Sequence, residues 1–185
     1  MRWRSGRAAR RDDTLLEILR SPPDRWDCGR AVRRQTAPVQ EIDKIGLGLD
    51  EQLCFALYAA SRAVTAAYRP LLAEVDLTFP QYLVMLTLWE EEPVRVGDIG
   101  ERLHLDSGTV SPLLKRLEAL GLIDRRRRSD DERSVEITLT AAGRDLRASV
   151  ERMPRVVASA TGLDPEGFAD LRTRLRTLAE HLRRT

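Results

Sequence analysis

Apolar side chains recur at steps of three and four residues over most of the chain after residue 49, as they do in amphipathic helices. The best delimited stripe lies between Asp106 and Gly121. Asp106 is suited to accept a first-turn N–H, and Gly121 suits the left-handed position just after a helix end. The pattern therefore predicts a helix over 106–121 with one apolar stripe, made of Val110, Leu113, Leu114, Leu117 and Leu120.

The segments on either side of this helix complete a motif. A short helix is predicted over 96–103, and only two residues separate it from the next one, which indicates a helix-turn-helix. After Gly121 the apolar period falls to two, which predicts strands over 122–127 and 135–139 joined by a polar tip. We therefore expect a mostly α fold, a winged helix-turn-helix with a small β-hairpin wing.

Further signals mark the boundaries of the flanking helices. Thr78 and Gln81 have the spacing of a capping box, and Thr140 is suited to cap the helix after the wing. Asp164 is followed by a proline, which is a favourable helix start. Pro70 is expected to kink or restart the helix that precedes it.

The first and last predicted helices each carry a narrow apolar stripe, from Leu53 to Tyr68 and from Phe168 to Leu182. The second stripe steps alternately by three and four residues, which is typical of a coiled-coil seam. The stripes either pack on each other within one chain or pair two chains, and we favour a homodimer. A two-fold dimer would place two reading helices in successive major grooves, roughly 34 Å apart.

The outward face of the predicted helix 106–121 and the adjoining strand carry small, hydroxylic or cationic side chains. Such groups can approach a DNA groove and reach phosphates or base edges, whereas the alternative is an ordinary solvated face. The hairpin that follows favours DNA, and we expect one or two phosphate contacts from the charge run 125–128. The residues assigned to DNA on these elements are Ser107, Thr109, Ser111, Pro112, Lys115, Arg116 and Arg127.

Composition locates the positive charge outside this motif. Residues 1–40 hold ten Lys or Arg and five Asp or Glu, so the rest of the 185-residue chain holds 21 and 24. Global charge is therefore no argument for nucleic-acid binding. We interpret residues 1–40 as an Arg-rich disordered tail or as upstream sequence translated from an early start codon. Residues 41–185 are then one domain, with a DNA-binding part at about 80–143 and dimerisation helices at about 50–72 and 144–183.

The cysteines and histidines exclude some classes of protein. Two cysteines, Cys28 and Cys54, are too few for a disulfide scaffold, and two histidines give no metal-ligand spacing. The apolar runs are too short to span a membrane, and the N-terminus lacks the apolar core of a secretory signal. We expect a cytoplasmic protein with neither a metal nor a cofactor.

The sequence VGDIGERLHLDSGTVSPLLKRLEALGLIDRRRRSDDERSVEITLTAAG, residues 96–143, resembles the winged-helix core of MarR-type regulators. Its DER at 131–133 is similar to the wing signature of that family. The segments LDEQLCFALYAASRAV and FPQYLVMLTLWE resemble the organic-hydroperoxide-sensing repressors, the OhrR type. The resemblance covers about 49–183 and omits only the tail.

The resemblance implies roles for five residues near the two-chain seam. Cys54 matches the peroxide-reactive cysteine, whereas the residues alone favour an inert core cysteine. Tyr58 and Tyr68 match ring hydroxyls of the cysteine pocket, at least one of them reaching across the dimer. Phe79 stands where the family usually has a tyrosine that bonds the sulfur. Either Tyr82 or water supplies that hydrogen bond, or the thiolate is less stabilised.

The resemblance also assigns two wing residues and the type of sensor. Arg133 matches the arginine that enters the minor groove, and Asp131 the residue that holds it; a solvated turn charge is the alternative for Arg133. No cysteine follows Cys54, so the chain resembles the one-cysteine sensors. In these the sulfenic acid forms a mixed disulfide with a low-molecular-weight thiol.

Three functions compete. The leading one is a homodimeric repressor that binds double-stranded DNA at a palindromic operator and releases it when an organic hydroperoxide oxidises Cys54. The second is a MarR-type repressor released by a reversible phenolic or lipophilic ligand. The third is a thiol peroxidase-like enzyme, which we do not favour because neither Arg nor Thr stands beside Cys54 and the core lacks a resolving cysteine. Cys28 remains as an unusual resolving partner.

Overall fold

The computed structural model describes residues 46–127 and 135–184, in two compact units that divide after Gln52. Within the first unit a short 3-10 helix, η2, spans Leu49–Glu51. Asp50 lies in η2, so the helix that we expected to begin at Asp50 is two separate elements. The predicted tail 1–40, including Cys28, falls outside the described residues.

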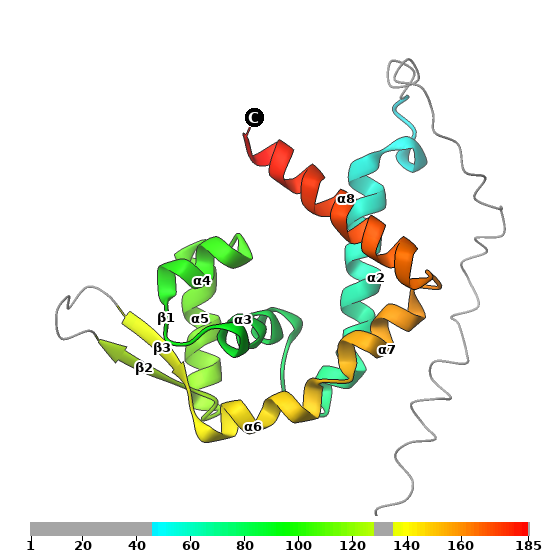
Figure 1. Cartoon of the computed structure of the whole chain (residues 1–185). Helices are drawn as coiled ribbons and strands as arrows, with labels where there is room; N and C mark the ends of the chain where they lie inside the picture. The colour runs from blue at the N-terminus through cyan, green and yellow to red at the C-terminus, as the bar shows by residue number, and fades with distance from the viewer. Residues whose placement is uncertain (1–45, 128–134, 185) are drawn as a thin grey trace, which may run out of the picture. The chain divides into compact units, whose positions relative to one another are not determined.

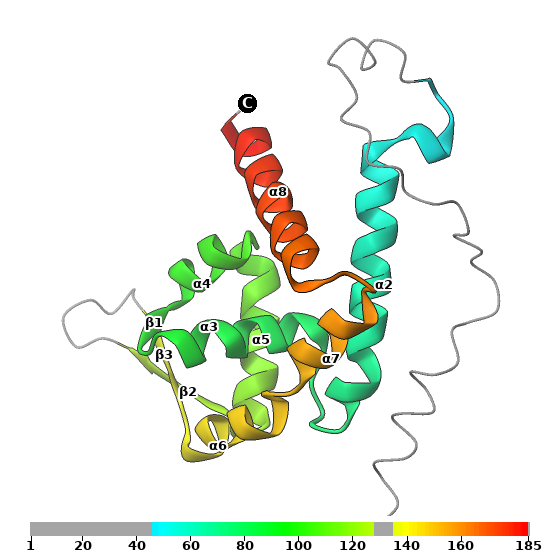
Figure 2. The same ribbon diagram turned by 45° about the vertical axis from the view of Figure 1, so that its right-hand side comes forward.

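The second unit is helical apart from three short strands (Figures 1 and 2). This confirms the predicted class, mostly α with a small wing. Its elements in chain order are α2 Leu53–Ala73, α3 Phe79–Glu90, β1 Val94–Arg95, α4 Val96–Leu103, α5 Ser107–Ala119, β2 Ile123–Arg127, β3 Val135–Leu139, α6 Ala141–Val150, α7 Met153–Ala160 and α8 Pro165–Arg184.

The strands form one antiparallel sheet in the order β1-β3-β2. The predicted hairpin is confirmed, with Ile123 opposite Leu139 and Arg127 opposite Val135. The sequence did not predict β1, whose Val94 lies opposite Ile137 on the other edge of β3. A strand of two residues is too short to display an alternating pattern.

The inner stripe of α5 lies at the centre of the winged-helix core. Val110, Leu114 and Leu117 are completely buried, together with Ile99 of α4 and Ile137 of β3. Each such side chain stabilises the fold by about 1.5–3 kcal/mol relative to its exposed state. The remaining stripe positions of α5 are half-buried at its edges.

The predicted helix caps are present in the structure, at the polar residues that precede the helices. The Asp106 carboxylate accepts from the Thr109 N–H, and the Thr140 hydroxyl accepts from the Gly143 N–H. Gln81 Oε1 accepts from both the N–H and the hydroxyl of Thr78, which fixes the start of α3. These side chains satisfy N–H groups that have no partner within a helix.

Of the two outcomes expected at Pro70, a kink or a restart, the restart does not occur, because α2 continues through this residue to Ala73. The extent of the helix after Thr140 was predicted wrongly. The single helix expected after Thr140 is instead divided into α6 and α7 at residues 151–152. Pro154 explains the division, since it has no N–H to donate to the carbonyl four residues earlier. In the described part of the chain, no helix is long and apolar enough to cross a membrane.

Candidate functional site

The outer face of α5 is a free surface held in place by its buried inner stripe. Six residues on or beside this face are exposed and Ser111 is half-buried. The exposed ones are Ser107, Gly108, Thr109, Pro112, Lys115 and Arg116. The helix therefore presents two cations, small residues and hydroxyl groups to solvent, as a helix that enters a DNA groove requires.

One of these residues has a second function. The Thr109 hydroxyl donates to Asp106 Oδ2 at 2.9 Å, while the Thr109 N–H donates to Oδ1 at 2.9 Å. These bonds from the Thr109 side chain and backbone lower the pKa of Asp106. Because its hydroxyl proton is directed at the cap, Thr109 presents acceptor lone pairs outward rather than a free donor.

The described part of the wing contains one arginine that is exposed and one that lies near an acidic side chain of α5. Arg125 of β2 is half-buried, and its Nη1 lies 4.0 Å from Glu118 Oε2 of α5. Arg126 is exposed and lies opposite Glu136 of β3 in the strand register. Arg127 ends β2, but its side chain, like all of Asp131 and Arg133, falls outside the described residues. Their assignment to DNA stays a prediction.

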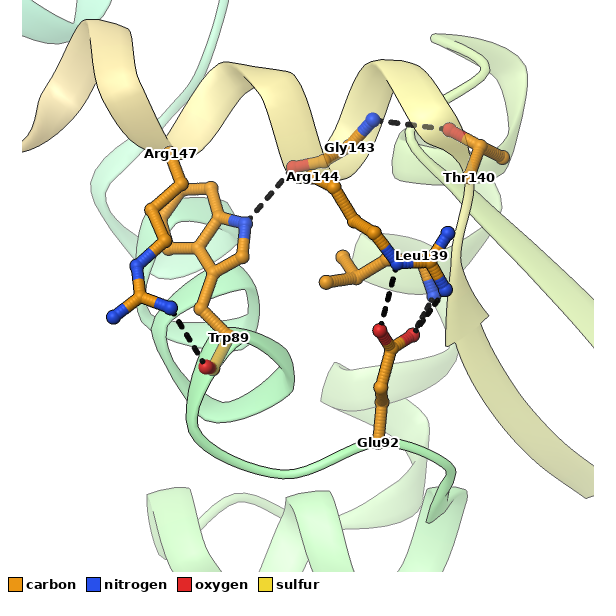
Figure 3. A network of polar contacts seen from close by, with 7 residues as sticks. All are labelled: Trp89, Glu92, Leu139, Thr140, Gly143, Arg144 and Arg147. Carbon is orange, nitrogen blue, oxygen red and sulfur yellow. Dashed lines mark hydrogen bonds and ion pairs between the residues drawn. The ribbon is translucent and has the colours of Figure 1, made fainter.

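The base of the wing contains an acidic residue that is not among the predicted site residues. Glu92 lies between α3 and β1, and its carboxylate accepts from the Leu139 N–H and from the Arg144 guanidinium (Figure 3). Desolvation by burial acts to raise the pKa of Glu92, but the hydrogen bonds from Leu139 and Arg144 lower it overall. Glu92 is therefore held as a carboxylate anion.

Cys54 is the second residue of α2, and its side chain is exposed. It lies in the first turn of that helix. Tyr58, one turn further on, is 57% exposed. Its hydroxyl lies 3.3 Å from Nη1 of Arg62, whose guanidinium carbon stands 5.6 Å from the ring centroid.

The other predicted pocket residues gather at the far end of α2. Tyr68 packs against Phe79 and Tyr82, with ring centroids 5.2 and 5.6 Å apart. Burial, with repulsion from Tyr68, raises the pKa of Tyr82 to about 12, so its hydroxyl remains a neutral donor. Fourteen residues of helix, roughly 21 Å, separate Cys54 from Tyr68. Within one chain, therefore, Tyr58 is near Cys54, whereas the Tyr68 cluster is not.

A cavity of about 1080 Å³ opens beside the Tyr68 cluster and is lined by residues of α2, α3, α4, α7 and α8. Its lining is largely apolar, including Val64, Tyr82 and Leu171, with several arginines such as Arg176. Such a space can take an aromatic or aliphatic molecule, and the arginines suit an anionic group on it.

The seam residues of the flanking helices are exposed in the single chain. Leu53 is 59% exposed, Leu175 is 41% exposed and Leu182 is 66% exposed, and α8 contains no buried residue. Within the described residues no group of His, Cys, Asp or Glu side chains could hold a metal ion.

Comparisons with known proteins give a consistent family. A model of the transcriptional regulators SarA/Rot matches residues 66–150. The HTH-type transcriptional regulator TtmR of Methylorubrum extorquens is 51% identical over 72% of this chain and 69% of its own length. The organic hydroperoxide resistance transcriptional regulator of Bacillus subtilis is 46% identical over 72% of this chain and 91% of its own length.

Solved structures agree with the sequence comparisons. Reduced AbfR bound to DNA superposes with a TM-score of 0.63 at 36% identity, covering 77% of this chain and 97% of that one. AbfR, from Staphylococcus epidermidis, has also been solved in an overoxidized form bound to DNA and in a disulfide form.

Proposed function

The chain belongs to the MarR/SarA family of DNA-binding transcriptional regulators, and we propose that it is a homodimeric repressor that senses organic hydroperoxides through Cys54. The family consists of regulators rather than enzymes, which disposes of the peroxidase hypothesis. The observation that carries the proposal is that Cys54 and Tyr58 are exposed on α2 next to Leu53, an apolar residue that is 59% exposed in the part of the chain that the structure describes.

DNA binding by this chain uses the outer face of α5 and the wing. AbfR binds DNA in crystals and shares the fold, which supports the proposal that the outer face of α5 enters a major groove. Lys115 and Arg116 supply the cations there, and the resemblance to MarR-type regulators assigns Arg133 to the minor groove. A palindromic operator follows from the two-fold symmetry of a dimer.

Pairing of two chains accounts for the exposed seam. Had α8 packed on α2 within one chain, its leucines would be buried, yet Leu171, Leu175 and Leu182 all remain exposed. Contiguous apolar side chains of this kind mark interaction surfaces. A second copy covers them and brings its own aromatic residues toward Cys54, which completes a pocket that a single chain does not assemble.

The chemistry requires only the Cys54 thiolate and two small reactants. The thiolate attacks the terminal oxygen of the hydroperoxide, the O–O bond breaks, and the leaving alkoxide takes up a proton to become the alcohol. Cysteine is thereby oxidised to the sulfenic acid, which condenses with a low-molecular-weight thiol to give a mixed disulfide and water. The added group at the seam tilts the subunits and separates the two reading helices from their half-sites.

A second candidate function has its own supporting observation. The cavity of about 1080 Å³ beside Tyr68 and Tyr82 suits a phenolic or lipophilic molecule that binds reversibly. Release of DNA by such a molecule when the Cys54 thiol is blocked would favour this function over peroxide sensing.

The test is a gel shift with a duplex that the wild-type protein selects from a random-sequence pool, with and without cumene hydroperoxide and a small thiol. Wild type and Cys28→Ser are expected to release the duplex on peroxide treatment. Cys54→Ser is expected to bind equally well but to retain the duplex. Unchanged release by Cys54→Ser would reject the sensing proposal and leave DNA binding standing.

A further inference from the structure

A cluster of polar contacts joins the base of the wing to α3 and α6, on the side of the sheet edge formed by β1 (Figure 3). None of these residues belongs to the DNA-facing surface assigned above. The cluster contains Glu92 and Trp89 from the end of α3 and the loop after it, and Leu139, Gly143 and Arg144 from the end of β3 and the start of α6.

Glu92 replaces a missing strand partner. Val94 lies opposite Ile137 in the β1–β3 register, and continuing that register by two residues places Glu92 opposite Leu139. The ladder stops before that point, and the Glu92 side chain takes the N–H instead, with Leu139 N 2.8 Å from Oε2. Without this carboxylate the Leu139 N–H would lose its acceptor at a half-buried position.

The same carboxylate also holds the first turn of α6. Arg144 Nε donates to Glu92 Oε1 at 2.9 Å, and Nη2 donates to Oε2 at 3.0 Å. This is the two-pronged guanidinium–carboxylate geometry, which fixes direction as well as distance. Because Leu139 and Arg144 stand on opposite sides of the β3–α6 corner, one anion fixes the angle of that corner.

Two neighbouring contacts hold α6 in place, so α6 has little freedom to shift and restore the contacts of Glu92 if these are lost. Trp89 Nε1 donates to the Gly143 carbonyl oxygen at 2.8 Å. A Cβ at Gly143 would overlap the carbonyl oxygen of Leu122, so α6 lies directly against the chain that enters β2. The Thr140 N–H donates to the same Leu122 oxygen at 3.1 Å.

We propose that Glu92 and Arg144 are positioning residues for operator binding, acting through the angle between the wing and α6. On the C-terminal side, the chain leaves the wing through α6, which leads to α7 and α8; the other connection to the pairing helices runs from α2 into α3, which Trp89 joins to α6. The β3–α6 angle therefore sets how each DNA-binding region is presented relative to the helices that pair two copies. This inference rests on the proposed dimeric, DNA-binding function, and it adds two residues that touch neither the DNA nor Cys54.

The consequence concerns specificity more than contact with phosphates. Binding to a palindromic site needs both reading helices at one spacing and angle. A variable β3–α6 angle in each subunit therefore weakens binding to that site. Non-specific binding depends on phosphate charge and is less sensitive to the β3–α6 angle. Loss of the Glu92–Arg144 pair should therefore lower affinity for a selected site much more than affinity for a scrambled duplex.

The experiment uses the full-length protein, the duplex it selects from a random-sequence pool, and a scrambled duplex of the same composition. Arg144→Gln and Glu92→Gln should each weaken selected-duplex binding about tenfold and scrambled-duplex binding less than twofold. The double variant should be no worse than the worse single one. Arg155→Gln is the matched control, because Arg155 carries the same charge, is exposed and pairs only with Glu151 at 3.9 Å among the contacts described.

Amide hydrogen exchange separates positioning from a loss of folding. Exchange at Leu139 should accelerate in Glu92→Gln and not in Arg155→Gln, while the amides of α5 keep their wild-type protection. The inference is overturned if Arg144→Gln behaves like Arg155→Gln, or if both duplexes lose affinity equally. If the wild-type protein selects no duplex at all, the proposed function itself is rejected, together with this role for Glu92 and Arg144.

Discussion

The winged-helix region, α3 to β3, and the C-terminal helix α8 differ in how far they bury the same residue type. Leucines of α5 such as Leu114 and Leu117 are completely buried, whereas Leu171 and Leu175 of α8 are 45% and 41% exposed. Both sets follow three- and four-residue steps. The difference shows that a stripe identifies a helix but does not determine whether that stripe is buried within the same chain.

The largest expected effect is the difference in stability loss when the same substitution, Leu to Ala, is made in each of the two regions. Leu114→Ala should lower the free energy of unfolding by about 2–5 kcal/mol, because it leaves a cavity in a closed core. Leu175→Ala removes the same atoms from a surface that is partly in water in one chain. The decrease in the free energy of unfolding should be smaller for Leu175→Ala, and should vanish as the protein is diluted to monomer. Denaturant unfolding at two protein concentrations measures both; equal, concentration-independent losses would contradict the comparison.

A charge on the seam should break the proposed dimer without unfolding the winged helix. Leu175→Asp places a carboxylate where the second copy packs, and we expect a monomer by analytical ultracentrifugation at micromolar concentration. Thr177→Asp is the control, since Thr177 is exposed two residues along and off the stripe. A Leu175→Asp protein that remains dimeric would remove α8 from the interface.

The smallest expected effect lies within the winged-helix region and depends on pH. The pKa of Asp106 is lowered in the folded state, so its contribution to stability is complete above the ordinary value of 3.8 and is lost as the pH falls below it. Asp106→Asn cannot be protonated in this way. The stability difference between wild type and Asp106→Asn should therefore shrink as the pH falls from about 5 toward 3. A constant difference over urea titrations in this range would show that the cap is not electrostatic.

The sequence was sufficient where one residue type determines one local structure. Asp106 and Thr140 were predicted as caps and accept the expected N–H groups. The inner stripe of α5 was predicted from its period, and the strands after Gly121 from the change of period.

Where the outcome depended on residues distant in the chain, the sequence was not sufficient. Glu92 belongs to an acidic run that ends α3, and nothing local indicates that it accepts from Leu139, 47 positions later. β1 exists only because β3 offers it an edge. The predicted Cys54 pocket combines residues that lie far apart along α2, and in our proposal a second copy of the chain brings them together.

Trp89 gives the β3–α6 corner a natural optical signal. It is the last tryptophan in the sequence, after Trp3 and Trp26, and its indole N–H is bonded to the Gly143 oxygen. With the two earlier tryptophans replaced by phenylalanine, the emission of the full-length protein comes from this one ring. Movement of α6 away from α3 exchanges that bond for water, and the emission maximum then shifts to longer wavelength. The contact between α3 and α6 is thus observable in real time during oxidation, without an attached dye.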